Sequence, residues 1–541
     1  MKRIWISLLA IVCISIGFLS FTSYKNNFFE ISKQLEIFID LYKELNTNYV
    51  DDLVPSQVME KAIQGVLNEL DPYTVFRNEQ QIIDARINHS GQYAGIGATV
   101  HFSGDKIKLL ECYENAPAAK AGLEAGDEII VFNGSKISEI TTDLQHNLLS
   151  GESGSEISMT YLRDGKEHKT TLTRARIERD AVPYYKLLDN NIGYIVLEAF
   201  NQKAASQTKS ALLDLKQKGA EKIILDLRNN PGGLLNESIK IVNFFIDKGV
   251  QVTYTESVIS KYNTSYVTRD EPIDTEIPLA ILINERSASA SEIISGSLQD
   301  LDRAVILGNQ SFGKGLVQRE MPLSYSTQLK VTISRYFTPS GRSIQKLDYD
   351  TDLVEKRNIQ GKDQVFYTKN KRKVYGGGGV MPDKMLESNL DQDFIKMLNS
   401  KLYLFDFASE YLKSNKITDL NKFALNNKDW QNFKQFMKDK EAFTKTNKAW
   451  ENLEIVAKEE GIETSLKSLE SDFKNQLASA LNQKLDAHRK TIEDNLTDIL
   501  IRRTHYQNAA YNYAVEHNET VLMAKDILNN KKEYQNVLMI K

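Results

Sequence analysis

The 541-residue chain is poor in cysteine and has little net charge, and both shortages are informative. Cys13 and Cys112 are the two cysteines, and the first lies in an apolar leader, so no intrachain disulfide is expected. Charged residues make up 26% of the chain and nearly cancel to a net charge of −4, so the composition indicates no nucleic-acid partner. The length is sufficient for several domains.

Proline and glycine are nearly missing from the C-terminal part. No proline follows Pro382, and Gly461 is the one glycine after Gly379. Apolar residues then recur at steps of three and four along residues 462–499, which predicts an all-α C-terminal region over 389–541 with a long amphipathic helix. Packing within its own bundle, a coiled-coil dimer contact and a wall around substrate are the alternatives for this helix.

Histidine is missing between residues 169 and 487, where apolar runs alternating with helical patterns predict a βα-layered core over 176–388. Within it, Ser287-Ala-Ser-Ala-Ser-Glu-Ile293 follows an apolar strand-like run and opens a helical pattern. A serine at such a turn is exposed beside the first helical N–H groups, which suits a nucleophile with part of an oxyanion hole. A Ser-His-Asp triad would have to take its base from a distant region.

Lysine is the other base able to serve a serine, provided that a dry pocket keeps it neutral. Lys314 fits this need because Gly313 and Gly315 let other backbone pass close by. Gln318, four residues on, can hydrogen-bond the amine without adding a charge. The sequence therefore predicts a serine–lysine pair, with no metal and no organic cofactor.

Three other interpretations compete for the same stretch. Residues 308–314 match a phosphate-binding loop for seven positions, but Gly315 stands where serine or threonine should hold magnesium. Ser311-Phe-Gly-Lys314 matches the Ser-x-x-Lys of penicillin-binding enzymes, yet the glycines spoil the helix and the companion motifs are missing. The third is a Gly- and Ser-rich turn inside a binding protein without catalysis.

The N-terminus predicts export. Lys2-Arg3 is followed by residues 4–21, which carry no charge, so residues 1–27 are expected to be a cleaved secretory signal or an uncleaved membrane anchor. The positive charges keep this end in the cytoplasm. The rest is then extracytoplasmic, in the bacterial periplasm, either soluble or anchored to the inner membrane. Residues 28–88, which come next, have helical periodicity.

The blocks around the serine and the lysine resemble the carboxyl-terminal processing peptidases, or tail-specific Ser-Lys proteases. The resemblance implies that Ser289 is the nucleophile, Lys314 the base and Gln318 the group that positions the lysine. It extends over roughly residues 35–385, because further blocks follow in family order: Leu70–Thr74, Leu225–Gly233, Tyr336–Arg342 and Gly377–Asp383. It also implies a crotonase-like arrangement of the α/β core and self-association through the N-terminal helices.

Residues 89–175 resemble a PDZ domain inserted before the core. The matching blocks are Tyr93-Ala-Gly-Ile-Gly97 and Ala121-Gly-Leu-Glu-Ala-Gly-Asp127. Peptide binding is therefore predicted at Tyr93, Ala94, Gly95, Ile96 and Gly97: the turn offers N–H groups to a C-terminal carboxylate, and the strand edge accepts an extended peptide. A PDZ fold that only braces its neighbours is the alternative. Arg163 is interpreted as a sensor facing the core or as a solvated charge.

The core holds further candidates. Asn229-Asn-Pro-Gly-Gly-Leu234 presents bare N–H groups, so the second oxyanion donor is placed on Gly232 or Gly233, paired with the N–H of Ala290. The alternative is that both glycines only turn the chain. Asp226 and Arg228 are expected to form a supporting ion pair, and residues 345–376 an exposed insertion.

Together these features predict an extracytoplasmic serine endopeptidase that captures protein C-termini through its PDZ domain. Whether that domain delivers substrate or restrains the cleft stays open. The expected partners are protein substrates and further copies of the chain, bound through the N- and C-terminal helices, with the membrane as an anchor for residues 4–21. A catalytically inactive PDZ scaffold is the alternative function.

Overall fold

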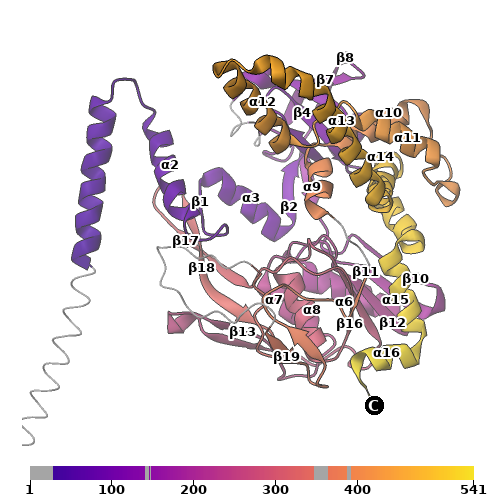
Figure 1. Ribbon diagram of the computed structural model, residues 1–541. Coiled ribbons are helices and arrows are strands. Elements are labelled where there is room, and N and C mark those ends of the chain that lie inside the picture. The colour runs from indigo at the N-terminus through magenta and orange to yellow at the C-terminus, as the bar shows by residue number, and fades with distance from the viewer. Residues whose placement is uncertain (1–27, 141–144, 146–147, 347–363, 387–390, 541) are drawn as a thin grey trace, which may run out of the picture. The chain divides into compact units, whose positions relative to one another are not determined.

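The computed structural model describes residues 28–140, 145, 148–346, 364–386 and 391–540 (Figure 1). The chain divides into two compact units, of which the first holds residues 1–76, 329–331 and 349–355. In its described part, residues 28–48 form a helix and α2 (Pro55–Asn68) begins with its proline in the first turn, where the missing N–H is harmless. These are the helices that the periodicity predicts.

The predicted leader, residues 1–27, lies outside the described residues. Within the described ranges, no helix combines the length and the apolar run that crossing a bilayer would require.

The second unit is built on a six-stranded sheet. Its order is β10 (Tyr184–Leu188), β11 (Ile192–Val196), β12 (Lys222–Asp226), β15 (Leu279–Ile283), β16 (Val305–Gly308) and β21 (Lys384–Met385). All neighbours from β11 to β21 are parallel, and β10 is antiparallel to β11. The strands β11, β12 and β15 are apolar along nearly their whole length because both faces of a parallel sheet are covered. The predicted α/β core is therefore confirmed.

The two faces of this sheet are covered by helices from opposite parts of the sequence. Leu225 and Ile281 point to a core shared with α6 (Ala204–Gln217), α7 (Leu235–Asn243) and α8 (Ala290–Asp300). Ile224 and Leu282, one position away in each strand, point to α15 (Glu519–Asn529) and α16 (Lys531–Leu538), drawn in yellow in Figure 1. Each fully buried aliphatic side chain contributes about 1.5–3 kcal/mol, so the last helices of the chain are part of the core that supports the site.

A second sheet contains the two strands that follow the lysine in the sequence. It contains β13 (Gln251–Glu256), β14 (Thr264–Val267), β17 (Leu316–Pro322) and β18 (Gln328–Phe337), with β18 pairing both β17 and β13; β1 (Val75–Arg77) lies at its edge. A short hairpin, β19 (Val365–Tyr367) and β20 (Lys373–Tyr375), follows.

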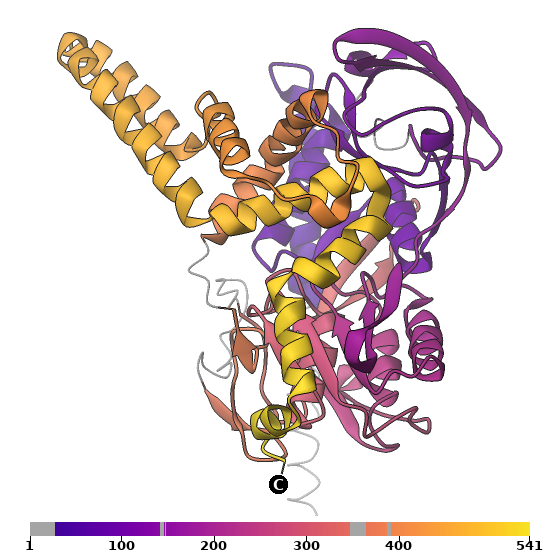
Figure 2. The same ribbon diagram turned by 90° about the vertical axis from the view of Figure 1, so that its right-hand side faces the viewer.

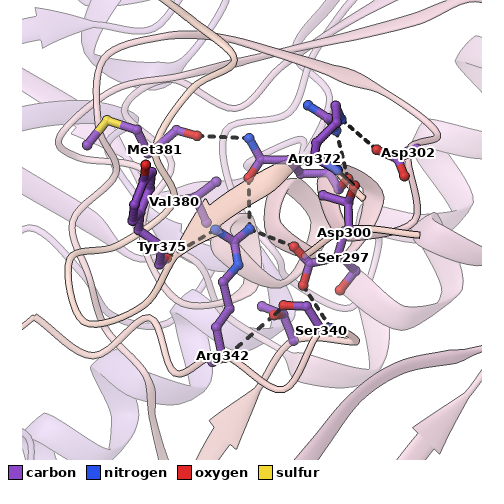
Figure 3. A network of polar contacts seen from close by, with 12 residues as sticks. Ser297, Asp300, Asp302, Ser340, Arg342, Arg372, Tyr375, Val380 and Met381 are labelled. Atoms are coloured by element: carbon purple, nitrogen blue, oxygen red, sulfur yellow. Dashed lines mark hydrogen bonds and ion pairs between the residues drawn. The ribbon is translucent and has the colours of Figure 1, made fainter. Parts of the chain in front are cut away.

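The expectation of an exposed insertion over 345–376 is only partly right, because exposed and buried residues alternate along its described part. Residues 347–363 lie outside the described ranges, but Gln345, Thr368, Arg372 and Val374 are buried. The charge of Arg372 is compensated by Asp302 and Asp383, so the charge that suggested exposure is held in ion pairs (Figure 3). Periodicity cannot reveal such pairing.

The predicted PDZ region forms its own β-rich fold. Its sheet has the order β3 (Ala98–Phe102), β4 (Ile107–Cys112), β5 (Glu128–Phe132), β7 (Glu156–Arg163) and β8 (Lys166–Thr173), with β6 (Ser135–Lys136) on β5. A separate pair joins β2 (Gln92–Gly95) to β9 (Ala175–Glu178), and α3 (Glu79–Ser90) and α4 (Pro117–Lys120) complete the region. Arg163 binds both oxygens of the buried Asp127 at 2.7 Å, so it stabilises the domain itself rather than facing the core or solvent alone.

The all-α C-terminal region is confirmed as well. It consists of α9 (Gln392–Ser400), α10 (Tyr403–Ser414), α11 (Asn427–Met437), α12 (Thr444–Glu459), α13 (Glu463–Ala487) and α14 (Arg489–His517), followed by α15 and α16. Leu481 and Leu485 pack in a cluster with Phe407, Trp430 and Phe433, which is the bundle interpretation of the amphipathic helix. Further toward its start, α13 pairs with α12 as an antiparallel arm, in which Trp450 stacks on Phe473 (Figure 2).

Candidate active site

Ser289 lies at the turn between β15 and α8, as the sequence predicts. It is the N-cap of α8 and has φ 55° and ψ −109°, a conformation that non-glycine residues rarely adopt. Such a backbone costs about 1–3 kcal/mol and persists only where surrounding contacts impose it. Here the turn aims a half-buried serine at the positive end of a helix, all of whose residues are buried.

The neighbouring serines identify the middle one as the reactive candidate. Ser287 is fully buried and donates its hydroxyl to Leu227 O at 2.8 Å. Ser291 is also fully buried and donates to Asn230 O at 2.9 Å. Both flanking hydroxyls therefore hold the backbone of the turn, whereas Ser289 alone of the three is partly open to solvent.

The carboxylate of Glu292 joins the serine segment to the lysine segment. Its Oε2 accepts the N–H of Ser289 at 2.8 Å and the N–H of Lys314 at 2.9 Å. Because both bonds end on one oxygen, the two backbone nitrogens lie within about 6 Å of each other. Its Oε1 accepts the Ser311 hydroxyl at 2.5 Å and the Gly313 N–H at 2.7 Å.

Complete burial raises the pKa of Glu292 from the ordinary 4.5 to about 7, while its four donors act in the opposite direction. The ionised form is the one that can accept all four hydrogen bonds. Sequence reasoning missed this residue. The signal was present, because an acid three positions after an N-cap serine is a capping-box pattern, and the Ser289 N–H to Glu292 bond is half of that motif.

Lys314 lies in an irregular loop between β16 and β17, and the N–H and carbonyl groups of residues 313–315 are all paired. Besides the two bonds to Glu292, the Gly315 N–H donates to Gln345 Oε1 at 2.7 Å. The carbonyls of Gly313, Lys314 and Gly315 accept from Lys346 N, Tyr336 Oη and Tyr336 N respectively. Three side chains from other segments thus fix the main chain that carries the lysine.

Gln318 follows on β17, half-buried, and donates its amide to Thr332 Oγ1 on β18 at 3.3 Å. This contact holds the Gln318 side chain against the second sheet. Its role in orienting the lysine amine stays a prediction.

The turn with Gly232 and Gly233 lies directly against the serine. A Cβ on Gly232 would come within 2.8 Å of Ser289 Cβ and 3.0 Å of Ala290 N, and its φ of 98° also requires glycine. The Gly232 N–H donates to Asn230 Oδ1 at 2.9 Å, so this donor is already engaged. The N–H groups of Gly233 and Ala290 have no hydrogen-bond partner in the described part of the chain, which leaves them as the available pair.

The predicted ion pair between Asp226 and Arg228 is present at 2.5 Å. Asp226 also accepts the buried Tyr194 hydroxyl at 2.6 Å. Arg228 donates to Asn518 Oδ1, the N-cap of α15. The pair therefore connects the end of β12 to the C-terminal helices.

The far end of α8 is held by buried charges (Figure 3). Arg342 and Asp300 are both fully buried and form an ion pair at 2.8 Å, and Arg342 also donates to Gln299 Oε1 at 2.8 Å. Arg372 donates to Gln299 O and pairs with Asp302. Removing one partner of a buried pair typically costs about 3–5 kcal/mol, so this network fixes the helix whose first turn carries Ser289.

The predicted peptide-binding residues lie at one corner of the PDZ fold. Tyr93, Ala94 and Gly95 are on β2, paired with β9, and burial raises the pKa of Tyr93. Ile96 and Gly97 connect β2 to β3, and their carbonyls accept from Ala118 N and Tyr113 N. The strand β3 pairs only with β4 among the described strands, so its other edge is the place where a peptide strand could add.

Comparison with known families finds a match for each of three regions: the α/β core, the PDZ region and the C-terminal helical region. The model described as "Peptidase family S41" matches residues 191–354, the "PDZ domain" model matches 94–173, and "Probable PDZ-protease, C-terminal helical domain" matches 394–528.

Two relatives match well over half of the chain. A "Carboxy-terminal-processing protease" of Bartonella bacilliformis is 35% identical over 343 residues, which cover 62% of this chain and 78% of that protein. A "Probable CtpA-like serine protease" of Staphylococcus haemolyticus is 30% identical over 383 residues, covering 70% and 69%. Among solved structures, the photosystem II D1 C-terminal processing protease matches with 25% identity and a TM-score of 0.37, over 66% of this chain and 93% of that one.

Fold and relatives together define a serine-type endopeptidase with a PDZ domain. The chain belongs to the carboxy-terminal-processing proteases of peptidase family S41.

Proposed function

We propose that the chain hydrolyses peptide bonds of exported proteins with a dyad of Ser289 and Lys314. The observation that carries this proposal is the Glu292 carboxylate, which binds the backbone N–H groups of both residues. Two segments 25 positions apart are thereby held at one point beside a helix N-terminus. Gln318, as the resemblance implies, orients the amine.

In the proposed acylation step, the neutral Lys314 amine takes the Ser289 hydroxyl proton while Oγ attacks the peptide carbonyl. The N–H groups of Ala290 and Gly233 stabilise the resulting oxyanion, and the ammonium returns its proton to the leaving amine. In deacylation, Lys314 takes a proton from water, and the hydroxide attacks the ester. Ser289 then regains its proton. No metal or organic cofactor enters either step.

The serine assignment is tested by comparing Ser289→Ala with Ser295→Ala. The control removes a hydroxyl that donates to Ser291 O inside α8. The lysine is tested by Lys314→Met against Lys346→Met, which removes an exposed amine next to the loop. With casein as substrate, the two dyad variants should lose about 10⁴-fold or more in initial rate, whereas the controls stay within a few-fold. Turnover by folded Ser289→Ala at the wild-type rate would refute the dyad.

We infer that the PDZ domain takes the C-terminal carboxylate of the substrate at Tyr93–Gly97, with the peptide added along β3. Two peptides that differ only in a free carboxylate or a carboxamide at the C-terminus test this step. The amidated peptide should show a KM raised by about tenfold. Equal KM values would remove the PDZ domain from C-terminal recognition.

We also propose an extracytoplasmic location, because Lys2-Arg3 precedes an uncharged apolar stretch. Fusing residues 1–40 to alkaline phosphatase, which is active only after export, gives the test. An inactive fusion that accumulates in the cytoplasm would contradict the location. Protease protection in spheroplasts then separates an anchored from a released protein.

Self-association is proposed through the helix of residues 28–48. Its side chains Phe28, Phe29, Ile31 and Leu35 are each more than half exposed, which is unusual for large apolar residues on one short segment. Ile31→Glu combined with Leu35→Glu should lower the molar mass measured by light scattering to that of one chain. An unchanged mass would place any self-contact elsewhere, for example on the C-terminal arm.

A further inference from the structure

The hydroxyl of Tyr336 contacts the main chain of both dyad residues. Tyr336 lies on β18, and its side chain is only 1% exposed. Its Oη donates to Lys314 O at 2.7 Å and lies within hydrogen-bond distance of Ser289 O at 3.2 Å. The Tyr336 N–H donates to Gly315 O at 3.0 Å, so the strand runs directly beside the lysine loop.

This hydroxyl complements the Glu292 carboxylate. Glu292 accepts from the N–H groups of Ser289 and Lys314, and Tyr336 serves the carbonyls of the same two residues. A phenol has one proton to donate, so the shorter bond to Lys314 O is the dominant one. Ser289 O already accepts two N–H groups of α8, from Glu292 and Ile293. The hydroxyl therefore connects the main chain of the lysine segment to the start of α8.

The lysine segment needs such a reference point because it has little stiffness of its own. Lys314 is flanked by Gly313, with φ 89°, and by Gly315, and the loop lies outside any strand or helix. A rotation of the Lys314–Gly315 peptide plane would move the lysine side chain relative to Ser289. A displacement of about 1 Å between reacting groups can lower a rate by about a hundredfold.

We propose that Tyr336 is a positioning residue for the dyad: its hydroxyl sets the Lys314 main chain relative to Ser289 without touching substrate. This inference rests on the proposed Ser289–Lys314 dyad. A residue that acts only on the alignment of the base should change kcat and leave the binding of substrate, and hence KM, nearly unchanged.

The test is Tyr336→Phe, which removes one oxygen atom and keeps the ring. The matched control is Tyr534→Phe on α16. That hydroxyl is also buried and bonded to backbone, accepting Leu279 N–H at 3.0 Å, but it lies at the start of β15, away from the serine turn. Steady-state kinetics with a quenched-fluorescence peptide and thermal unfolding are measured for both.

Tyr336→Phe should lower kcat by about 10- to 100-fold with KM within about twofold of wild type. Tyr534→Phe should keep kcat within about twofold of wild type, even where its Tm falls as much as that of Tyr336→Phe. The proposal is overturned by a wild-type kcat in folded Tyr336→Phe, or by equal losses of kcat in the two variants at equal losses of Tm. Ser289→Ala and Lys314→Met in the same assay distinguish a failure of the dyad from a failure of the positioning role. If these two variants turn over normally, both proposals are wrong. If they are inactive while Tyr336→Phe has a normal kcat, only the positioning role is wrong.

Discussion

Replacing Glu292 by glutamine should separate catalysis from stability. Each carboxylate oxygen accepts two donors, Ser311 Oγ and Gly313 N on one side, Ser289 N and Lys314 N on the other. Glutamine keeps the shape but must place its NH₂ group against one of these pairs, whichever way the amide is turned. Two of the four hydrogen bonds are then lost. With the NH₂ group toward Ser289 N and Lys314 N, the serine and lysine segments lose their common acceptor; with it toward Ser311 Oγ and Gly313 N, the lysine loop loses its other two bonds to this side chain.

The stability effect should be small because two contributions oppose each other. Losing two hydrogen bonds costs about 1–3 kcal/mol each. Against this, burial raises the pKa of Glu292 from 4.5 to about 7, so the ionised carboxyl itself costs about 3 kcal/mol that a neutral amide avoids. We therefore expect the free energy of unfolding to change by less than about 3 kcal/mol. Catalysis has no such compensation, and kcat should fall by about a hundredfold or more.

The assay is peptide hydrolysis at about pH 8, above the pKa of Glu292, with urea unfolding of the same samples. Glu237→Gln is the matched control, since Glu237 is a buried acid on α7 that accepts Ala205 N–H at 2.9 Å away from the dyad. It should keep kcat. A Glu292→Gln variant with wild-type kcat would refute the argument that all four bonds to this carboxylate are needed to align the dyad.

Four further outcomes follow. As pH rises, the free energy of unfolding of wild type should fall by up to about 3 kcal/mol relative to that of Glu292→Gln, because the raised pKa of Glu292 in the folded state gives a stability that is complete below pH 4.5 and is lost as pH rises through about 7. Tm measured against pH tests this, and parallel curves for the two proteins would contradict it. Gly232→Ala should abolish turnover, as its methyl would meet the Ala290 N–H; a normal kcat would exclude that turn from the oxyanion site. Arg503→Met loses a 2.6 Å bond to Ala125 O of the PDZ region, so amide exchange over 124–127 should quicken, and unchanged exchange would make the contact unimportant. Phe433→Ala empties a fully buried position in the helical cluster and should cost about 3–5 kcal/mol by calorimetry; a loss below 1 kcal/mol would deny that packing.

Local patterns predicted the parts of the site that depend on local chemistry. The run 278–284 and the small polar residues after it placed Ser289 on a strand-to-helix turn, and the glycines at 232 and 233 placed a second turn beside it. Apolar runs likewise predicted β11, β12 and β15, because strands covered on both faces have little polar sequence.

Long-range pairing was beyond the reach of the same patterns. The bonds that join Glu292 to Lys314 N and Tyr336 to Lys314 O each span 22 positions, and no local signal says which distant backbone group a buried carboxylate or phenol will meet. The charge of Arg372 suggested an exposed segment because its acidic partners, Asp302 and Asp383, lie outside that segment. The helix α15 has an ordinary amphipathic pattern, which fits any apolar surface equally well, so its place on the core sheet could not be deduced.

The proposed dyad requires that Ser289 is acylated and that Lys314 removes its proton. Rapid acid quench of the enzyme with a peptide p-nitrophenyl ester, followed by mass spectrometry of a digest, tests it most directly. We predict one acyl adduct, on Ser289, formed by wild type and undetectable in folded Lys314→Met. An adduct on another residue would rule out Ser289 as the nucleophile, and an equal rate of acylation in Lys314→Met would rule out Lys314 as its base.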